Sequence, residues 1–345
     1  MSGNNQAVFM NHRSFSPEPY GIVLWMGGSV VVLEPATWTD ITSSYISVQP
    51  TASVAGSHEK MMKAPRQDKY IGFGSWSLGA APAGSVMDIS TVPWVSVNDY
   101  TAITEDGSGS SSMSVAASPY GYMAGASHSS TADEAICNIA TKAEVAGQPS
   151  SFTSAGGGFG AVKVYGDYLY TARSAGLVKY LFTSGTLVQS AINTSYSSSY
   201  TDLAVASDDS RVYMTNGTSI EIFDGSLNHL STVSLTGFSN LETMEISPDD
   251  KWLLVAGTAS PDVNGKTAML NTATLAVTYP AVPITGLSSG RMTGSSWYPD
   301  SDRYIVTGYS GARTHLGSRS AGGVITNLHT YIGSANAHGA AVLSE

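Results

Sequence analysis

The segment Ser247-Pro248-Asp249-Asp250-Lys251-Trp252-Leu253-Leu254-Val255-Ala256-Gly257 places a polar turn directly before a run of apolar residues. Pro, Asp and Ser suit a tight turn, because Pro presets φ and the short polar side chains bond nearby backbone groups. Trp and Val suit the pleated face of a β-sheet. The pattern returns at 207–215 and at 298–308, so the sequence predicts a turn followed by a strand at all three places.

Weaker copies of this pattern stand upstream and bring the number of copies to seven. Their first strand residues are Ile22, Tyr70, Tyr122, Tyr168, Val212, Trp252 and Tyr304. Successive anchors are 48, 52, 46, 44, 40 and 52 residues apart, and the blades of β-propellers repeat at roughly 40 to 50 residues. We therefore predict an all-β protein, a single seven-bladed β-propeller of four-stranded antiparallel blades that spans residues 1–345.

Each copy also carries the other strands of a blade. An inner strand precedes the turn, as at 203–206, and a third strand follows, as at 220–223. In the last copy the third strand is predicted at Val324–Leu328, after a long loop at Gly308–Gly323. The predicted blades span 7–50, 57–98, 111–147, 158–191, 200–236, 240–280 and 290–333. Residues 334–345 either supply a closing strand or hang free as a docking tail.

The segment at 247–257 resembles the blade signature of YVTN, lactonase-like and WD40-like propellers. The resemblance is clear in the three C-terminal copies, and the full Gly-His and Trp-Asp dipeptides of WD40 repeats are absent. It implies a propeller fold. It implies little about activity, because propellers host many unrelated functions.

Charge is scarce in this chain. Asp, Glu, Lys and Arg make up 12% of the residues, against about 25% in an ordinary soluble protein, and Ser, Thr, Gly and Asn take their place. The net charge is −10 and the 16 basic residues are scattered, which argues against nucleic-acid binding because phosphates require clustered cations. We expect neither a secretory signal nor membrane insertion, since no basic and apolar leader opens the chain and no stretch approaches about 18 apolar residues.

No residue pattern predicts catalysis, a metal or a cofactor, so an enzyme is the less favoured interpretation. The acidic turn residues recur once per copy, and we interpret them as turn caps, because a Ca²⁺ site needs about six to eight converging ligands. They are Asp208, Asp209, Asp249, Asp250, Asp300 and Asp302. The seven histidines lack zinc spacing, although His12 and His58 stand near inner strands and remain an alternative ligand pair. Cys137 is interpreted as a small buried strand residue.

Long loops are the remaining candidates for binding, because function concentrates on loops held by a rigid scaffold. The loop at Ser75–Gly84 displays Trp76, and the loop at Gly308–Gly323 displays Arg313, His315 and Arg319 in an otherwise acidic protein. Exposed Trp and Arg are typical of contact hot spots. We predict these four residues as a partner-binding patch, with tolerated insertion as the alternative.

The leading functional expectation is a structural or attachment protein of a virus particle, such as a bacteriophage capsid-decoration or tail-associated propeller. Such a protein is made in the host cytoplasm without a signal and works in the virion, in contact with other virion proteins or a host-surface receptor. Synthesis in the cytoplasm followed by assembly into the virion would account for a surface rich in hydroxyls and poor in charge on a chain that lacks a signal peptide. The alternatives are a lactonase-like or small-molecule-binding propeller and a cytoplasmic WD40-like interaction scaffold.

Overall fold

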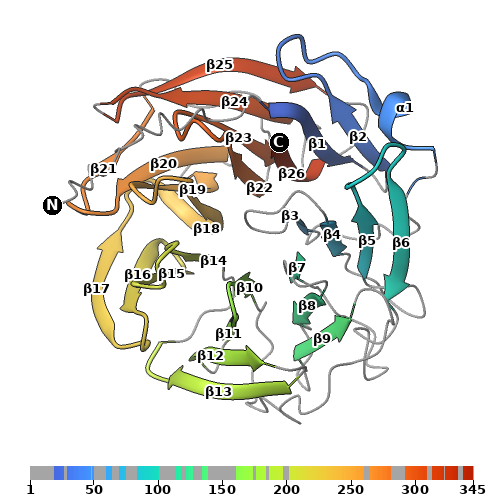
Figure 1. Cartoon of the computed structure of the whole chain (residues 1–345). Coiled ribbons are helices and arrows are strands. Elements are labelled where there is room, and N and C mark those ends of the chain that lie inside the picture. The colour runs from blue at the N-terminus through green and yellow to red at the C-terminus, as the bar shows by residue number, and fades with distance from the viewer. Residues whose placement is uncertain are drawn as a thin grey trace, which may run out of the picture.

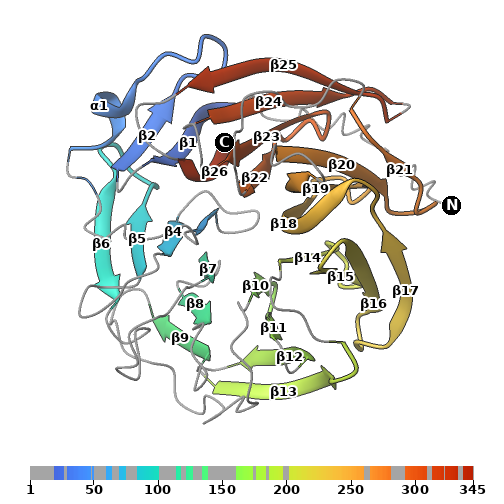
Figure 2. The same cartoon turned by 180° about the vertical axis from the view of Figure 1, so that it is seen from behind.

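The computed structural model describes residues 19–26, 29–47, 49, 60–63, 70–74, 84–100, 114–117, 122–126, 134–138, 161–173, 176–183, 186–196, 202–259, 265–280, 292–308, 313–321, 323–332 and 337–344. Within these ranges, 26 strands form seven antiparallel sheets. The sheets stand side by side around a ring, with one strand of each near the centre and another at the rim (Figures 1 and 2). The predicted all-β propeller class is therefore confirmed.

The sheets are blades 1 to 7, numbered along the chain. Blade 1 holds β1 (Pro19–Met26), β2 (Ser29–Leu33) and β26 (Ala337–Ser344). Blade 2 holds β3 (Lys60–Lys63), β4 (Tyr70–Gly74), β5 (Gly84–Asp88) and β6 (Val95–Tyr100). Blade 3 holds β7 (Ser114–Ala117), β8 (Tyr122–Ala126) and β9 (Glu134–Asn138). A short helix, α1 (Thr42–Tyr45), follows β2.

The remaining blades each have four strands. Blade 4 holds β10 (Ala161–Tyr165), β11 (Tyr168–Arg173), β12 (Gly176–Thr183) and β13 (Thr186–Asn193). Blade 5 holds β14 (Leu203–Val205), β15 (Arg211–Asn216), β16 (Ser219–Asp224) and β17 (His229–Ser234). Blade 6 holds β18 (Phe238–Ile246), β19 (Trp252–Ala259), β20 (Gly265–Asn271) and β21 (Val277–Thr278). Blade 7 holds β22 (Met292–Trp297), β23 (Arg303–Gly308), β24 (Arg313–Arg319) and β25 (Ile325–Ile332).

All seven predicted anchors lie in the second strand of their blade, counted from the ring centre. The turn before that strand explains the pattern. In blade 6 the Ser247 N–H donates to the Trp252 carbonyl over 2.8 Å, and Asp250 has φ +58°. Blades 5 and 7 repeat this geometry with Asp209 at +61° and Ser301 at +59°. Short polar side chains tolerate the left-handed region better than most residues do.

The predicted third strand of blade 7 is wrong. That strand is β24, which lies in the segment expected to be a long loop, and the predicted stretch Val324–Leu328 overlaps the outermost strand, β25. The sequence of β24, Arg-Thr-His-Leu-Gly-Ser-Arg, lacks the apolar run that marks the other third strands. Its His315 and Arg319 are buried instead of exposed, which the composition alone does not indicate.

The two ends of the described chain meet in blade 1. β26 pairs antiparallel with β1, with Ile22 opposite Val342 and Leu24 opposite Ala340. The C-terminal strand therefore forms the inner strand of the first blade (Figure 1). Segments from opposite ends of the sequence close the ring through backbone hydrogen bonds.

Blade 1 has three strands, and side chains satisfy the outer edge of β2. The Gln49 side-chain amide accepts from the Val30 N–H at 2.7 Å and donates to the Val30 carbonyl at 3.1 Å. The Thr42 hydroxyl accepts from the Val32 N–H at 2.9 Å, and the Ile41 N–H donates to the Val32 carbonyl at 2.8 Å. These groups replace the hydrogen bonds of a fourth strand.

The core consists of apolar seams between neighbouring blades. One seam joins Tyr213 and Ile222 of blade 5 to Leu253 and Val255 of blade 6, and others join blades 4 and 5, 6 and 7, 7 and 1, and 1 and 2. Blades stack face to face because each sheet must bury both faces. Among the described residues, no helix is long and apolar enough to cross a membrane.

Candidate functional site

The structure places the predicted basic patch in a strand instead of a loop. Arg313, His315 and Arg319 lie on β24, where His315 is 2% and Arg319 8% exposed. The expectation of an exposed cationic loop is therefore wrong. Alternate residues of a strand lie on the same face, so these three side chains share one face of β24. The contacts of Arg319 show that this face lies against blade 6. Trp76, the fourth predicted residue, lies outside the described residues.

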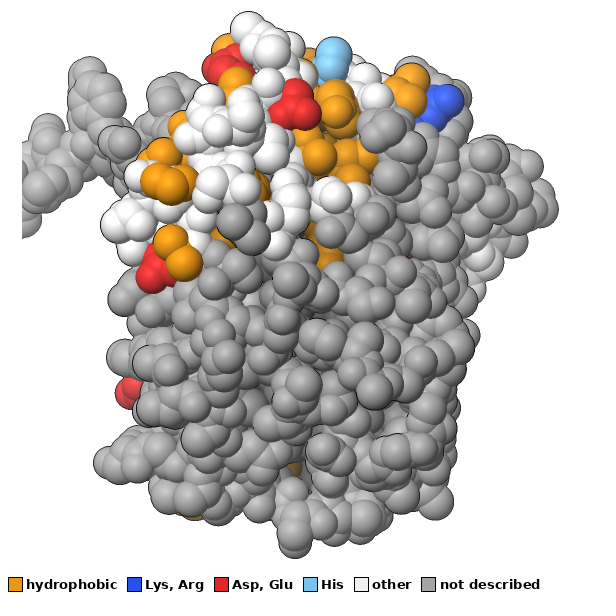
Figure 3. Space-filling view, turned by 90° about the vertical axis from the view of Figure 1, so that its right-hand side faces the viewer, with side chains coloured by type: hydrophobic (Ala, Val, Ile, Leu, Met, Phe, Trp, Pro, Cys, Tyr) orange, Lys and Arg blue, Asp and Glu red, His pale blue; other side chains and the backbone are white. Residues whose placement is uncertain are grey.

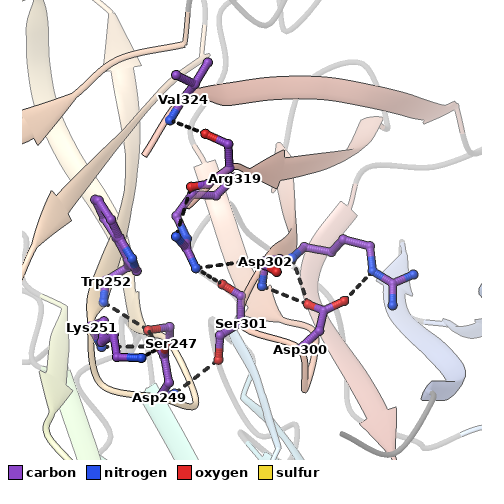
Figure 4. A network of polar contacts seen from close by, with 11 residues as sticks. Ser247, Asp249, Lys251, Trp252, Asp300, Ser301, Asp302, Arg319 and Val324 are labelled. Carbon is purple, nitrogen blue, oxygen red and sulfur yellow. Dashed lines mark hydrogen bonds and ion pairs between the residues drawn. The ribbon is translucent and has the colours of Figure 1, made fainter. Parts of the chain in front are cut away.

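Arg319 joins blades 6 and 7 (Figure 4). Its Nη2 atom donates to Asp302 Oδ1 and to the Ser301 carbonyl, both at 2.8 Å. Its guanidinium carbon lies 4.8 Å from the centroid of the Trp252 ring, which belongs to blade 6. A buried cation needs such partners because an uncompensated charge is costly in the interior. We therefore assign Arg319 a role at the seam between blades, and its predicted part in partner binding stays a prediction.

His315 is held within the same blade. Its Nδ1 atom lies 2.9 Å from the hydroxyl of Thr330 on β25. Burial, assisted by the nearby charge of Arg313, lowers the pKa of His315 to about 4. The imidazole is therefore neutral at physiological pH, and it acts as a packing residue there.

The acidic turn residues have two separate roles. Asp208 and Asp300 cap their own turns, as predicted: Asp208 accepts from the Ser210 N–H, and Asp300 accepts from the Asp302 and Arg303 N–H groups, all at 2.9 Å. These bonds confirm the interpretation of the turn carboxylates as caps at these two positions.

The next turn position reaches the preceding blade. Asp250 accepts from the Ser207 N–H of blade 5 at 3.0 Å, and the Ser301 hydroxyl accepts from the Asp249 N–H of blade 6 at 3.2 Å. Asp209, the equivalent residue of blade 5, contacts Tyr170 and Lys179 of blade 4. The left-handed residue of each turn is therefore a bridge between blades, a role that the local sequence pattern did not reveal.

Lys179 is the buried cation of the seam between blades 4 and 5. Its side chain is 6% exposed and forms an ion pair with Asp209. The Nζ atom also donates to the Gly225 carbonyl at 2.9 Å and lies 3.9 Å from the centroid of the Tyr168 ring. Burial lowers the pKa of Lys179, and the charge of Asp224 opposes that shift.

Polar side chains on the inner strands also join blades. Asp202, just before β14, accepts from the Met244 N–H of blade 6 at 2.8 Å. Glu242 on β18 accepts from the Met292 N–H of blade 7. Both accept backbone hydrogen bonds, which consumes at least one oxygen of each.

One further polar cluster lies on blade 5. Glu221, 4% exposed, accepts from the Thr232 hydroxyl at 2.6 Å and contacts His229 Nε2 at 2.9 Å. The Thr232 hydroxyl and the carboxylate approach the same nitrogen of His229. A catalytic triad needs the hydroxyl and the carboxylate on opposite nitrogens, so the cluster does not have that geometry.

Within the described part of the chain, no group of three or more His, Cys, Asp or Glu side chains is placed to hold a metal. His12, His58 and His128 lie outside that part. Cys137 falls in β9, which agrees with the predicted strand.

The outer strands carry the exposed apolar surface. The large hydrophobic residues that are exposed in the described ranges all lie on a fourth strand or within three residues of one: Val92, Val95, Val188, Ile192, Leu230, Val324, Leu328 and Ile332. On the side shown in Figure 3, the described residues expose several apolar groups and few charged ones. Rim strands are therefore the best candidates for contact surfaces.

Four of the outer strands are interrupted by a register shift of one residue. The residues without a partner in the ladder are Val97, Ser190, Leu230 and Leu328, on β6, β13, β17 and β25. Such bulges disrupt an edge and reduce unwanted pairing with other sheets. In blades 5 and 7 the bulge presents a leucine that is 47% and 51% exposed.

The ring of stacked antiparallel sheets defines a β-propeller, and comparison with known proteins agrees with this at the level of fold. No family model and no curated protein matches the chain. A solved protein from Lactobacillus plantarum has a TM-score of 0.67 at 13% identity, over 93% of this chain and 98% of that one. A candidate 6-phosphogluconolactonase from Bacteroides uniformis has a TM-score of 0.64 at 11% identity, over 94% and 99%.

A functionally unknown protein from Desulfotomaculum acetoxidans also has a TM-score of 0.64, at 12% identity and over 94% of this chain and 99% of that one. Identities this low establish a shared fold and carry no activity with them, because one fold hosts many functions. The predicted resemblance to lactonase-like propellers therefore holds for architecture.

Proposed function

We propose that this propeller is a non-enzymatic structural or attachment subunit of a virus particle, a bacteriophage capsid-decoration or tail-associated protein that acts through contacts with virion proteins or a host surface. The observation that carries the proposal is the distribution of polar groups. Three buried charged side chains contact a neighbouring blade: Arg319 packs on the Trp252 ring, Lys179 is paired with Asp209, and Asp202 accepts from the Met244 N–H. The exposed apolar groups lie at the rim.

The composition supports the same proposal. A surface of hydroxyls with 12% charged residues is solvated, yet carries few charges that must be desolvated when two subunits pack together. The cores of protein interfaces are depleted in charged residues for this reason. A rigid closed ring with few charged residues on its outer strands suits a building block that is packed against others.

A lactonase-like or small-molecule-binding propeller is the second candidate, and the structural likeness to the Bacteroides uniformis protein favours it. That activity would need polar groups that converge at one mouth of the ring. Metal analysis of the purified protein and a lactone-hydrolysis assay test it. A WD40-like scaffold is a third candidate, which would be found with cellular partners.

Mass spectrometry of purified particles from the source tests the leading proposal. We expect the protein in the particles at a fixed ratio to the capsid or tail proteins, and retained after a wash in high salt. Its absence from the particles, or a ratio that varies between preparations, would overturn the proposal. Lactone hydrolysis that is abolished by removing a bound metal would support the second candidate instead.

A further inference from the structure

The seam between blades 4 and 5 holds an amine and a carboxyl group in direct contact. Lys179 lies on β12, the third strand of blade 4, and its side chain is 6% exposed. Asp209 lies in the turn before β15 of blade 5, where its φ is +61°, and it forms an ion pair with the lysine. A primary amine and a carboxyl group are the two reactants of an amide bond, so this contact is a candidate for a covalent modification.

The lysine is enclosed on several sides. Its Nζ atom lies 3.9 Å from the centroid of the Tyr168 ring and 5.5 Å from that of Tyr170. Gly225 of blade 5 packs against Asp209, because a Cβ atom at position 225 would clash with the Asp209 carbonyl oxygen and lie 3.4 Å from Oδ2. Two groups held together in such a site react as if they were highly concentrated, with effective molarities of about 10⁵ to 10⁸ M for well-oriented pairs.

Hydrogen bonds place the two groups for this reaction. The Tyr170 hydroxyl donates to Asp209 Oδ1, an oxygen on which negative charge develops when an amine adds to the carboxyl carbon. A donor at that position stabilises the developing charge. Lys179 Nζ donates to the other oxygen, Oδ2, and to the Gly225 carbonyl at 2.9 Å. One carboxyl oxygen is therefore stabilised in place, and the other receives protons from the amine.

Burial favours the uncharged forms of both groups, and these are the forms that react. Burial raises the pKa of Asp209 to about 6. It also lowers the pKa of Lys179, although the charge of Asp224 opposes that shift. The neutral amine is the nucleophilic form of a lysine. Transfer of one proton from Nζ to Oδ2, along their hydrogen bond, gives the amine and the carboxylic acid together.

We propose that Lys179 and Asp209 condense into an amide that joins blades 4 and 5. The bond between Nζ and Cγ forms, the bond between Cγ and Oδ2 breaks, and Oδ2 leaves as water with a second proton from Nζ. The third Nζ proton stays on the amide. The reaction needs no oxidant or other reactant, and the Asp209 side chain is 26% exposed, so the released water can reach the solvent.

The ion pair is the state of the newly folded chain, and the amide forms from it. The bond closes a loop of 30 residues, which restricts the unfolded chain as a disulfide does. The single cysteine of this sequence cannot form a disulfide within the chain. The proposal is independent of the virion function, since it concerns the isolated chain.

Mass spectrometry of the intact, denatured protein tests the proposal after the folded protein has been kept at neutral pH until its mass is constant. We expect the wild type to be lighter than its sequence requires by one water molecule. Lys179→Arg keeps a cation beside Asp209 but has no amine, so it should have the full mass of its sequence. The control is Lys251→Arg, which alters an exposed lysine that pairs with Asp249 at 3.2 Å and should keep the loss of water.

Two results of this experiment would overturn the proposal. One is a wild type with the full mass of its sequence. The other is a loss of water that persists in Lys179→Arg, because the dipeptide Asp224-Gly225 can also lose water, when the glycine nitrogen attacks the aspartate side chain.

Peptide mapping of the wild type locates the bond without relying on a variant. Trypsin does not cleave after an acylated lysine, so we expect residues 174–211 as one peptide that lacks one water molecule, and no peptide 174–179. Further cleavage with chymotrypsin after Tyr200 should leave the segments that contain Lys179 and Asp209 joined. Fragments that place the bond on Asp202 or Asp208 would contradict the proposed geometry.

Discussion

At the scale of single residues, two buried cations join neighbouring blades. Arg319 is paired with Asp302 and packs on Trp252, and Lys179 is paired with Asp209. Desolvation makes a buried charge unfavourable unless an opposite charge and hydrogen bonds compensate for it. We therefore expect a carboxylate at these seams to contribute more to stability when the cation it pairs with is more deeply buried.

Asp209→Asn is expected to lower the free energy of unfolding by about 2 kcal/mol, because Lys179 loses its counter-ion while the shape of the side chain is kept. Asn also tolerates the positive φ of this position. The control is Asp250→Asn, the equivalent residue of blade 6, which accepts from the N–H and the hydroxyl of Ser207 and has no ion pair among the described residues. Urea denaturation compares the two, and a larger loss for Asp250→Asn would contradict the assignment.

The lowered pKa of His315 predicts that the protein loses stability in acid. Its pKa is lowered to about 4 in the folded protein, against about 6.5 in an unfolded chain. The unfolded chain therefore takes up a proton first, so this contribution is complete above pH 6.5 and is lost as the pH falls from 6.5 to 4. The limit is about 3 kcal/mol.

Urea denaturation at pH 7 and pH 4.5 measures this effect. His315→Gln should show a smaller loss between the two pH values than the wild type. His329→Gln, which replaces an exposed histidine of β25, is the control for the removal of an imidazole. Equal losses in His315→Gln and the wild type would show that another group governs the acid response.

At the scale of elements, the second strand of every blade was predictable because its signal is local. A polar turn followed by apolar residues reports both the turn geometry and the burial of the strand, as at Ser247–Gly257. β24 gave no such signal. The sequence pattern around Arg313, His315 and Arg319 predicted a surface loop. These residues are packed by partners in β23, β25 and blade 6, and only the folded structure brings those partners close. The bridging role of Asp209 escaped prediction for the same reason.

The edge of β2 leads to a prediction about Gln49. Gln49→Ala removes both side-chain hydrogen bonds to Val30 and leaves an edge backbone pair without those partners, so we expect a loss of about 1 to 2 kcal/mol. Gln189→Ala, on the outer strand β13, is the control for the loss of an exposed glutamine. Thermal denaturation followed by circular dichroism measures both, and equal effects would mean that the amide does not act as a substitute strand.

At the scale of the whole molecule, the ring depends on the pairing of β1 with β26. Removal of residues 337–345 deletes the inner strand of blade 1 and exposes Ile22 and Leu24, which are fully buried in the intact ring. We expect this truncation to lower the melting temperature by at least about 10 °C or to yield aggregates, since several kcal/mol of packing is lost. Removal of Glu345 alone is the control and should leave the melting temperature unchanged.

The repeated units followed from spacing, whereas the manner of closure did not. The seven anchors each fall in a different sheet of the described residues. Nothing in residues 334–345 distinguishes a closing strand from a tail, because the partner of this segment lies at the other end of the chain. Only the curvature of the assembled sheets determines that β26 reaches β1.

This closure has a consequence for synthesis of the chain. Ile22 is made 320 residues before its partner Val342, an interval on the order of tens of seconds at ordinary elongation rates. During that time β1 lacks its neighbour β26, and the incomplete sheet can pair with a strand of another nascent chain. We therefore expect slower translation, which lengthens this exposure, to lower the fraction of chains that close their own ring.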